Sequence, residues 1–323
     1  MVGANRESTR NDLDLLVQVA ESYYLENKNQ AQIAAEFGLS TATISRLLSR
    51  AREEGIVRIN IVRPQARHGS LEAGLRQKYG LAEAIVAGMP AGITDDEAAR
   101  RILGLVAAPY IDALIRPGTV VGIGRGRTLA ALAEGLQSLA TPRQITVVQI
   151  LGEYGVQNSP MRTSEITRLM AESYSGNSYY LNVPAQVEDR TIAEALRRAP
   201  GISDVIAVFD RLDMALVGVG PLRGSPLEAS QLLSAQHLAN LEAAGAVGEI
   251  CGHYFDSAGR SVDAAYSGCA MGISWNQLQH CPRVVAVAAG NAKIEPLRAL
   301  AAARLIHVLA TDELTARQIL ELP

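Results

Sequence analysis

The sequence predicts an α/β protein with a small all-α domain at its N-terminus and a larger, doubly wound, Rossmann-like α/β domain after it. Three observations support this prediction. With 323 residues the chain is too long for one ordinary small domain. Residues 30–54 carry apolar side chains at the spacing of two consecutive helices. Beyond residue 70, short apolar segments alternate with helical patterns, which is typical of parallel strands covered by helices on both faces.

The composition favours a protein with a large core. Hydrophobic residues make up 48% of the chain, and the formal net charge of −3 argues against a polycation that coats nucleic acid. The N-terminus lacks the apolar segment of a signal peptide, and no apolar run reaches membrane-spanning length. Cys251, Cys269 and Cys281 form no CxxC pair, so we expect neither a disulfide framework nor a zinc site. We therefore expect a cytoplasmic protein with no metal, no cofactor and no membrane partner.

The chain begins with a polar stretch, residues 1–11, that we interpret as disordered or as an arm. A helix starting at Asp12 follows it, and residues 30–37 form the next helix. Gly38 supplies the permissive backbone of a tight turn. Ser40 or Thr41 then caps the helix after the turn. This order of elements predicts a helix–turn–helix.

The helix after the turn has one apolar and one polar face. Its apolar stripe, which we expect to face the core, consists of Ile44, Leu47, Leu48 and Ala51. Small side chains on the other face permit close approach to the DNA major groove, and arginines there reach phosphates or guanine edges. The alternative is a solvated amphipathic helix whose charges face water. The predicted DNA-binding residues are Ser40, Thr41, Ala42, Thr43, Ser45, Arg46 and Arg50.

The charge around this helix is positive although that of the whole chain is not. Five arginines and two glutamates lie between residues 41 and 63, an excess that suits phosphate contact. Because the excess is modest, we expect oligomers that engage several half-sites. Residues 57–61 alternate like a short strand, which is either a rudimentary wing or the exit strand. We place the DNA-binding domain at 1–63, the linker at 64–70 and the larger domain at 71–323.

The larger domain is predicted from strands and helices in alternation. The expected strands are 84–87, 119–123, 145–151, 178–181, 204–208, 215–219, 284–288 and 306–310. The expected helices are 95–115, 129–139, 161–174, 191–198, 232–244, 292–303 and 312–320. In such a sheet, ligands bind beyond the carboxyl ends of the strands.

One strand-to-helix turn has the composition of a phosphate cradle. Gly122, Gly124 and Gly126 let backbone N–H groups approach an anion, and the helix that begins near Thr128 favours negative charge at its N-terminus. Arg127 and Thr128 add hydrogen-bond donors. The spacing matches neither GxGxxG nor the loop that binds nucleotide triphosphates. The alternative is a sharp turn that needs glycine only for its geometry.

Two further segments carry candidate ligand groups. Lys293 lies in the first helical turn after strand 284–288, where a cation opposes the helix dipole unless an anion or carbonyl compensates it. The alternative is a lysine that reaches out to water. Glu249 stands among glycines in an otherwise apolar stretch and suits the hydroxyl groups of a polyol, or else it stabilises a turn. The residues expected to line the same crevice are Asp213, Gly218 and Gly220.

Seven motifs extend this pattern over nearly the whole chain. They are AEFGLSTATISRLLSRAREEGIVRI in the helix–turn–helix, VGIGRGRTL at 121–129, VPA at 183–185, MALVGVG at 214–220, GAVGEICGHYFD at 245–256, VAVAAGNAK at 285–293 and LATDE at 309–313. In this order they resemble the SorC/DeoR-type family of bacterial sugar-responsive transcription regulators.

The resemblance implies an N-terminal DNA-binding domain and an effector domain folded like sugar-phosphate isomerases and deaminases. It also implies oligomers, commonly tetramers, on double-stranded operator DNA, and a phosphorylated sugar as effector. The site residues it implies are Gly126, Arg127 and Thr128 for the phosphate and Glu249 and Lys293 for the sugar. Ala289, where relatives often have glycine, and Pro221 depart from the pattern and leave the identity of the effector open.

We therefore predict a transcriptional regulator, a repressor, of a carbohydrate-catabolism operon that responds to a phosphorylated sugar or related polyol. The alternative is a sugar-phosphate isomerase or deaminase with a DNA-binding head, in which Glu249 and Lys293 transfer protons. Such chemistry needs paired groups within hydrogen-bond reach of one substrate carbon. Because the sequence offers one carboxylate and one lysine, we expect no enzymatic activity and name no catalytic residue.

Overall fold

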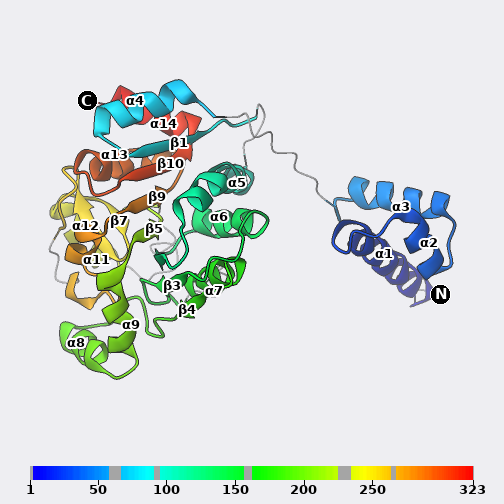
Figure 1. The fold of residues 1–323 in the computed structure, drawn as a ribbon, viewed down its shortest axis with the longest axis horizontal. Helices are drawn as coiled ribbons and strands as arrows, with labels where there is room; N and C mark the ends of the chain where they lie inside the picture. The colour runs from blue at the N-terminus through cyan, green and yellow to red at the C-terminus, as the bar shows by residue number, and fades with distance from the viewer. Residues whose placement is uncertain are drawn as a thin grey trace. The chain divides into compact units, whose positions relative to one another are not determined.

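The computed structural model describes residues 3–57, 67–90, 95–155, 162–224, 234–262 and 267–322. The chain divides into two compact units, residues 1–62 and 63–323 (Figure 1). Each unit has its own buried apolar cluster, and each is described by itself.

The smaller unit contains the three helices α1 (Gly3–Tyr24), α2 (Gln30–Phe37) and α3 (Thr41–Glu53). Gly38 ends α2 in the left-handed conformation, with φ 65°. The Ser40 hydroxyl then caps α3 by accepting the Thr43 N–H at 3.1 Å. The prediction of a disordered segment or an arm over residues 1–11 was wrong from Gly3 onward, since α1 already begins at that residue. A polar segment can continue a helix once its apolar neighbour is packed, because propagation costs less than nucleation.

Side chains from all three helices meet in the core of the smaller unit. The fully or nearly fully buried members are Leu16, Val19, Ile33, Ile44, Leu48 and Ala51. The predicted stripe of α3 therefore faces the core, with Leu47 half-buried at its edge. Of the predicted strand 57–61, residues 58–61 lie outside the described part of the chain.

The larger unit is built on a seven-stranded sheet in the order β1-β10-β9-β5-β2-β3-β4, and every neighbouring pair is parallel. Its strands are β1 (Glu83–Ala87), β2 (Val120–Ile123), β3 (Thr146–Gln149), β4 (Asn177–Tyr179), β5 (Met214–Val217), β9 (Val284–Val287) and β10 (Val308–Asp312). The central strands β5 and β9 are buried along their whole length. This explains why they appear in the sequence as continuous apolar runs.

Helices cover both faces of this sheet (Figure 1). One face carries α5 (Asp96–Leu114), α6 (Arg127–Gln137) and α7 (Thr163–Ser173). The other carries α4 (Gly69–Tyr79), α8 (Arg190–Arg198), α9 (Ile202–Val208), α12 (Trp275–His280), α13 (Ile294–Ala302) and α14 (Glu313–Glu321). The helices α5 and α6 pack so closely that a Cβ on Gly104 would lie 2.5 Å from the backbone carbon of Ala131.

A second, three-stranded antiparallel sheet was missed by the sequence prediction. It contains β6 (Gly220–Pro221), β7 (Ala246–Ile250) and β8 (His253–Asp256), in that order. The helix α11 (Ala235–Ala243) precedes it. The described residues of this unit also form three short 3-10 turns, η1 (Phe209–Arg211), η2 (Ser267–Cys269) and η3 (Asn291–Lys293).

Two other expectations are corrected. The segment expected as strand 204–208 is the helix α9, which buries Val205 and Val208 on one side. A short apolar run fits either element, and here the run follows Gly201, which has φ 82° and precedes a helix. In addition, the expected linker includes structured residues, since Arg67 bridges to Ala87 and α4 begins at Gly69.

Candidate functional site

The strand order reverses between β2 and β5, and we call the region beyond the turns that follow these two strands the crevice. These two strands are neighbours, yet the chain leaves β2 toward β3 on one side and later adds β5 on the other. In open parallel sheets, ligands bind at such a reversal of strand order, beyond the carboxyl ends of the strands. We therefore expect the candidate ligand groups among the residues that follow β2, β5 and β9.

The turn after β2 presents an uncapped helix N-terminus to this crevice. Gly126 is the residue before α6, has φ 155°, and supplies no side-chain cap. The first turn of α6 holds Arg127, which is exposed, and Thr128, which is 3% exposed. The first N–H groups of a helix have no partner within it and, together with the helix dipole, attract anions.

Gly122 and Gly124 serve the packing of this region. Gly122 lies within β2, where a Cβ would approach the Ile150 side chain to 2.7 Å. Gly124 donates its N–H to the Leu216 carbonyl at 2.9 Å, which ties the turn to β5. The glycines of this motif thus have different tasks, and Gly126 is the one at the helix N-terminus.

The turn after β5 lies against the turn after β2. A Cβ on Gly218 would stand 2.4 Å from the carbonyl oxygen of Arg125, so this position excludes any side chain. Gly220, in β6, lies beside Glu249, because its Cβ would be 3.2 Å from a carboxylate oxygen of that residue. The structure therefore brings Gly126, Gly218, Gly220 and Glu249 together.

Glu249 is half-buried in β7, and one of its oxygens accepts the Gly252 N–H at 2.5 Å. This bond fits the turn-stabilising interpretation for Oε1. The other oxygen has no partner among the described residues. Burial raises the pKa of Glu249, while the Gly252 N–H and the charges of Arg125 and Lys293 act in the opposite direction.

Lys293 ends η3, directly after the turn that follows β9, and is half-buried. Within the described part of the chain its ammonium group makes neither a hydrogen bond nor an ion pair. Burial lowers its pKa from 10.5 to about 8, and repulsion by Arg100 and Arg127 adds to this effect. Attraction by Glu249 and Asp96 opposes it. Charged side chains on α5, α6 and β7 therefore all act on the ammonium group of Lys293.

Sequence reasoning missed three residues of this region. The Arg125 guanidinium lies over the Tyr154 ring, 4.7 Å from its centroid. Burial, with a contribution from Glu249, raises the pKa of Tyr154 well above its ordinary value. Arg100, the third, lies in α5, and its charge contributes to lowering the pKa of Lys293. Arg125 could have been assigned to the candidate site from its position within the glycine motif. Tyr154 and Arg100 are distant from that motif in the sequence, and only the fold brings them to this region.

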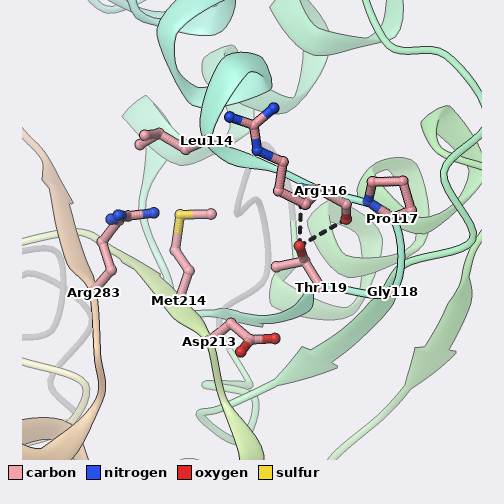
Figure 2. A pocket seen from close by; sticks show the side chains of 8 residues that line it. All are labelled: Leu114, Arg116, Pro117, Gly118, Thr119, Asp213, Met214 and Arg283. Atoms are coloured by element: carbon pink, nitrogen blue, oxygen red, sulfur yellow. Dashed lines mark hydrogen bonds between the residues drawn. The ribbon is translucent and has the colours of Figure 1, made fainter.

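Asp213 does not lie with the other predicted ligand residues. It precedes β5, at the amino edge of the sheet, and its carboxylate accepts the Val120 N–H at 2.8 Å. There it lines a cavity of about 330 Å³ with Arg116, Thr119, Met214 and Arg283 (Figure 2). The Thr119 hydroxyl, bonded to both the N–H and the carbonyl of Arg116, fixes the loop at its rim.

In the smaller unit, the predicted DNA-binding residues extend from Ser40, the cap of α3, to Arg50 in its last turn. Six of the seven are exposed, and Thr43 is half-buried: the exposed residues are Ser40, Thr41, Ala42, Ser45, Arg46 and Arg50. An Arg46 N–H reaches the Thr43 hydroxyl at 3.4 Å. Arg50 pairs with Glu54 at 2.6 Å, an exposed ion pair of the kind that contributes little to stability.

The described residues contain neither a candidate metal site nor a candidate membrane span. Their His, Cys, Asp and Glu side chains form no group of three or more that could hold a metal ion. None of the helices in the described ranges is both long enough and apolar enough to cross a membrane. The three cysteines are free and buried.

The chain is similar to known proteins over most of its length. A family model described as "Putative sugar-binding domain" matches residues 63–321. The sorbitol operon regulator of Klebsiella pneumoniae is 31% identical over 312 residues, which cover 96% of this chain and 98% of that protein. The deoxyribonucleoside regulator of Bacillus subtilis is 29% identical, over 96% and 98% of the two chains. The crystal structure of full-length SorC from K. pneumoniae aligns with a TM-score of 0.74 over 96% of this chain and 99% of that chain.

Proposed function

Because the chain belongs to the sugar-binding family of SorC-type transcriptional regulators, we propose that its larger unit binds a phosphorylated sugar or related polyol and that its smaller unit binds operator DNA. The relatives are named as regulators of sorbitol, deoxyribonucleoside and erythritol functions, which supports a carbohydrate-catabolism operon as the target. The α/β unit is the sensor in this proposal, and the three-helix unit is the output.

The observation that carries the sensor role is the convergence of groups without partners at the crevice. The N-terminus of α6 has no side-chain cap, and Lys293 has no partner among the described residues. One oxygen of Glu249, which faces Gly220, also has no hydrogen-bond partner among the described residues. An anion at α6 would use the free N–H groups and Lys293, while the Glu249 carboxylate would accept hydrogen bonds from sugar hydroxyls.

The smaller unit fits the proposal of a helix–turn–helix. α3 follows a tight turn at Gly38 and is tied to α1 and α2 by its apolar stripe, which leaves the opposite face free. Small residues at its N-terminal end permit close approach of the backbone to the major groove. Arg46 then reaches base edges or phosphates, and Arg50 exchanges its exposed Glu54 partner for a phosphate.

We further propose a repressor that releases DNA when the effector binds, and an oligomer, a tetramer, that engages several half-sites. The local positive charge of one DNA-binding unit is modest, so affinity and specificity depend on the assembly. The assembly then exists in two arrangements in equilibrium. The effector and the DNA each shift this equilibrium toward the arrangement that they bind more tightly, by an amount set by the difference between their affinities for the two arrangements.

A thermal-shift screen of the full chain against sugar phosphates and polyols tests the sensor role. A ligand that binds the folded state raises the melting temperature, and Thr128→Ala should reduce that shift because it removes a buried hydroxyl from the first turn of α6. The proposal is contradicted if a ligand is found whose shift is the same in Thr128→Ala, Lys293→Met and the parent.

A second candidate, an enzyme of the sugar-phosphate isomerase type, is favoured by one observation. The pKa of Glu249 is raised and that of Lys293 is lowered to about 8, which brings an acid and a base toward neutral pH. Incubation of the purified chain with candidate sugar phosphates, followed by product analysis, separates the two. Turnover that Lys293→Met abolishes would establish the enzyme, and unchanged substrates support the regulator alone.

A further inference from the structure

A cavity at the amino edge of the parallel sheet has no part in the proposed sensor function. Its volume of about 330 Å³ lies within the range of about 300–1,000 Å³ that is usual for small-molecule sites. Three loops line it, those that lead into β2, β5 and β9 (Figure 2). Ligands of doubly wound sheets bind at the carboxyl edge, so the fold itself does not account for a polar cavity at the opposite edge.

Each of the three loops brings one charged side chain to the cavity. Arg116 precedes β2, Asp213 precedes β5 and Arg283 precedes β9. Among the described residues, neither guanidinium group makes a hydrogen bond or an ion pair, although Asp213 lines the same cavity. Asp213 uses Oδ2 to accept the Val120 N–H at 2.8 Å, and its Oδ1 has no partner in the described part of the chain. The described residues thus leave two cations and one carboxylate oxygen available to a ligand.

Arginines that follow a helix often serve its last carbonyl groups, but other residues do so here. At the end of α5, Arg143 donates from Nη1 to two carbonyl oxygens, at 2.6 and 2.8 Å. In α12, the Nδ1 atom of His280 lies 2.7 Å from a backbone carbonyl oxygen. The two helix ends that precede Arg116 and Arg283 therefore have their own partners, and capping does not explain these two side chains.

Hydrogen bonds fix the backbone that carries the three charged residues. The Thr119 hydroxyl bonds to both the N–H and the carbonyl of Arg116, at 2.9 and 2.7 Å. The Asp213 N–H donates to the Val120 carbonyl at 3.0 Å, and the Arg283 carbonyl accepts an N–H of β5 at 2.9 Å. A ligand that binds between loops held in this way does not have to order them, which lowers the entropic cost of binding.

The chemistry of the lining selects a class of ligand. Guanidinium groups bind carboxylates through paired N–H donors. Two arginines and one aspartate leave one excess positive charge, which matches a monoanion, whereas a phosphate dianion would bring a second negative charge toward Asp213. The free oxygen of Asp213 accepts a hydrogen bond from a hydroxyl or ammonium group. Met214, which is buried, and Leu114, which is half-buried, offer apolar contacts to a short carbon chain.

We propose that the amino-edge cavity is a second ligand site of the larger unit and that it binds a small monocarboxylate with a hydroxyl or ammonium group. The carboxylate binds Arg116 and Arg283 from its two sides, and the hydroxyl or ammonium group donates to Oδ1 of Asp213. This site goes beyond the proposed sensor function and does not depend on it, because none of its residues belongs to the crevice.

Titration calorimetry of the full chain with lactate, alanine, propionate and inorganic phosphate tests this proposal. Lactate or alanine should bind, and propionate should bind about tenfold more weakly because it has no donor for Asp213. Arg116→Gln and Arg283→Gln should each weaken binding about tenfold to a hundredfold, the range of one charge-assisted hydrogen bond. Asp213→Asn should abolish the difference between lactate and propionate, since an amide NH2 group in place of Oδ1 cannot accept a hydrogen bond.

Arg101→Gln is the matched control, because Arg101 is an exposed residue of α5 that does not line the cavity. Binding of no monocarboxylate, or equal binding by the parent and both arginine variants, would overturn the site. Lactate binding that is lost in Lys293→Met and kept in Arg116→Gln would place the probe in the crevice and likewise overturn it. Stronger binding of phosphate than of lactate, sensitive to Arg116→Gln, would overturn the ligand class. A changed molar mass of the arginine variants in light scattering, without probe binding by the parent, would make the cavity a contact between copies instead.

Discussion

Replacing Lys293 by methionine should stabilise the protein without ligand while removing its response to anions. The pKa of Lys293 falls from 10.5 to about 8 because its charged form is half-buried and faces two arginines. Each pKa unit corresponds to about 1.36 kcal/mol, so the charged form costs about 3 kcal/mol as an upper bound. Because the ammonium group keeps some contact with water, we expect Lys293→Met to raise the free energy of unfolding by about 1–2 kcal/mol near pH 7.

The sign of the pH dependence follows from the same shift. Below about pH 8 the lysine is charged in both the folded and the unfolded chain, so the folded state bears the full cost. As the pH rises from about 8 toward 10.5, the folded state loses the proton first and the cost disappears. The advantage of Lys293→Met should therefore be largest below pH 8 and shrink above it.

Urea unfolding followed by tryptophan fluorescence measures this effect in the full chain. Trp275 is the only tryptophan of the sequence and lies in α12, so its signal reports the larger unit. Arg101→Gln, which also removes one exposed positive charge, is the control and should change the free energy of unfolding by less than about 0.5 kcal/mol. A destabilised Lys293→Met, or a gain that does not vary between about pH 7 and pH 10, would refute the electrostatic reasoning.

Three other predictions concern the two units separately. Arg46→Ala should weaken DNA binding and reduce the salt slope of log K by about one if Arg46 contacts a phosphate, and unchanged affinity in an anisotropy titration would contradict its placement. Gly218→Ala should destabilise the larger unit by about 1–3 kcal/mol, since the new Cβ would stand 2.4 Å from the Arg125 carbonyl oxygen; full stability in urea would show that the turn yields freely. Phosphate affinity should fall as the pH rises through about 8, where free Lys293 loses its proton, and a flat calorimetric profile would exclude Lys293 from the site.

The parallel sheet could be predicted from sequence because its strands are buried on both faces. Strands such as β5 and β9 contain almost only apolar residues, and turn signals separate them from the helices. The same criterion failed at 204–208, where the four-residue apolar run 205–208 belongs to the helix α9. The β7–β8 hairpin was missed because its glycines and Glu249 interrupt the apolar pattern, and its tight turn uses Cys251 at φ 49° followed by Gly252.

The positions of the candidate ligand residues could be predicted where chain order decides them and could not be predicted where the fold decides them. Gly126 and Lys293 follow strands of the parallel sheet and therefore lie at its carboxyl edge, whereas Glu249 lies in β7 of the second sheet, beside Gly220. Asp213 was assigned to that edge although it precedes its strand, which places it at the opposite edge. Arg100 gives no local signal, because what distinguishes it is a buried nitrogen atom that makes no hydrogen bond to any described residue.

The DNA affinity of the full chain, with and without a sugar phosphate that binds the crevice, tests the central claim most directly. DNA selected from a random pool would serve as the probe, in fluorescence anisotropy titrations of the parent and of Thr128→Ala. We predict that the sugar phosphate lowers the DNA affinity of the parent by about fivefold or more and that Thr128→Ala binds DNA normally but loses this response. Equal DNA affinity of the parent with and without a bound sugar phosphate would contradict the coupling of the two units.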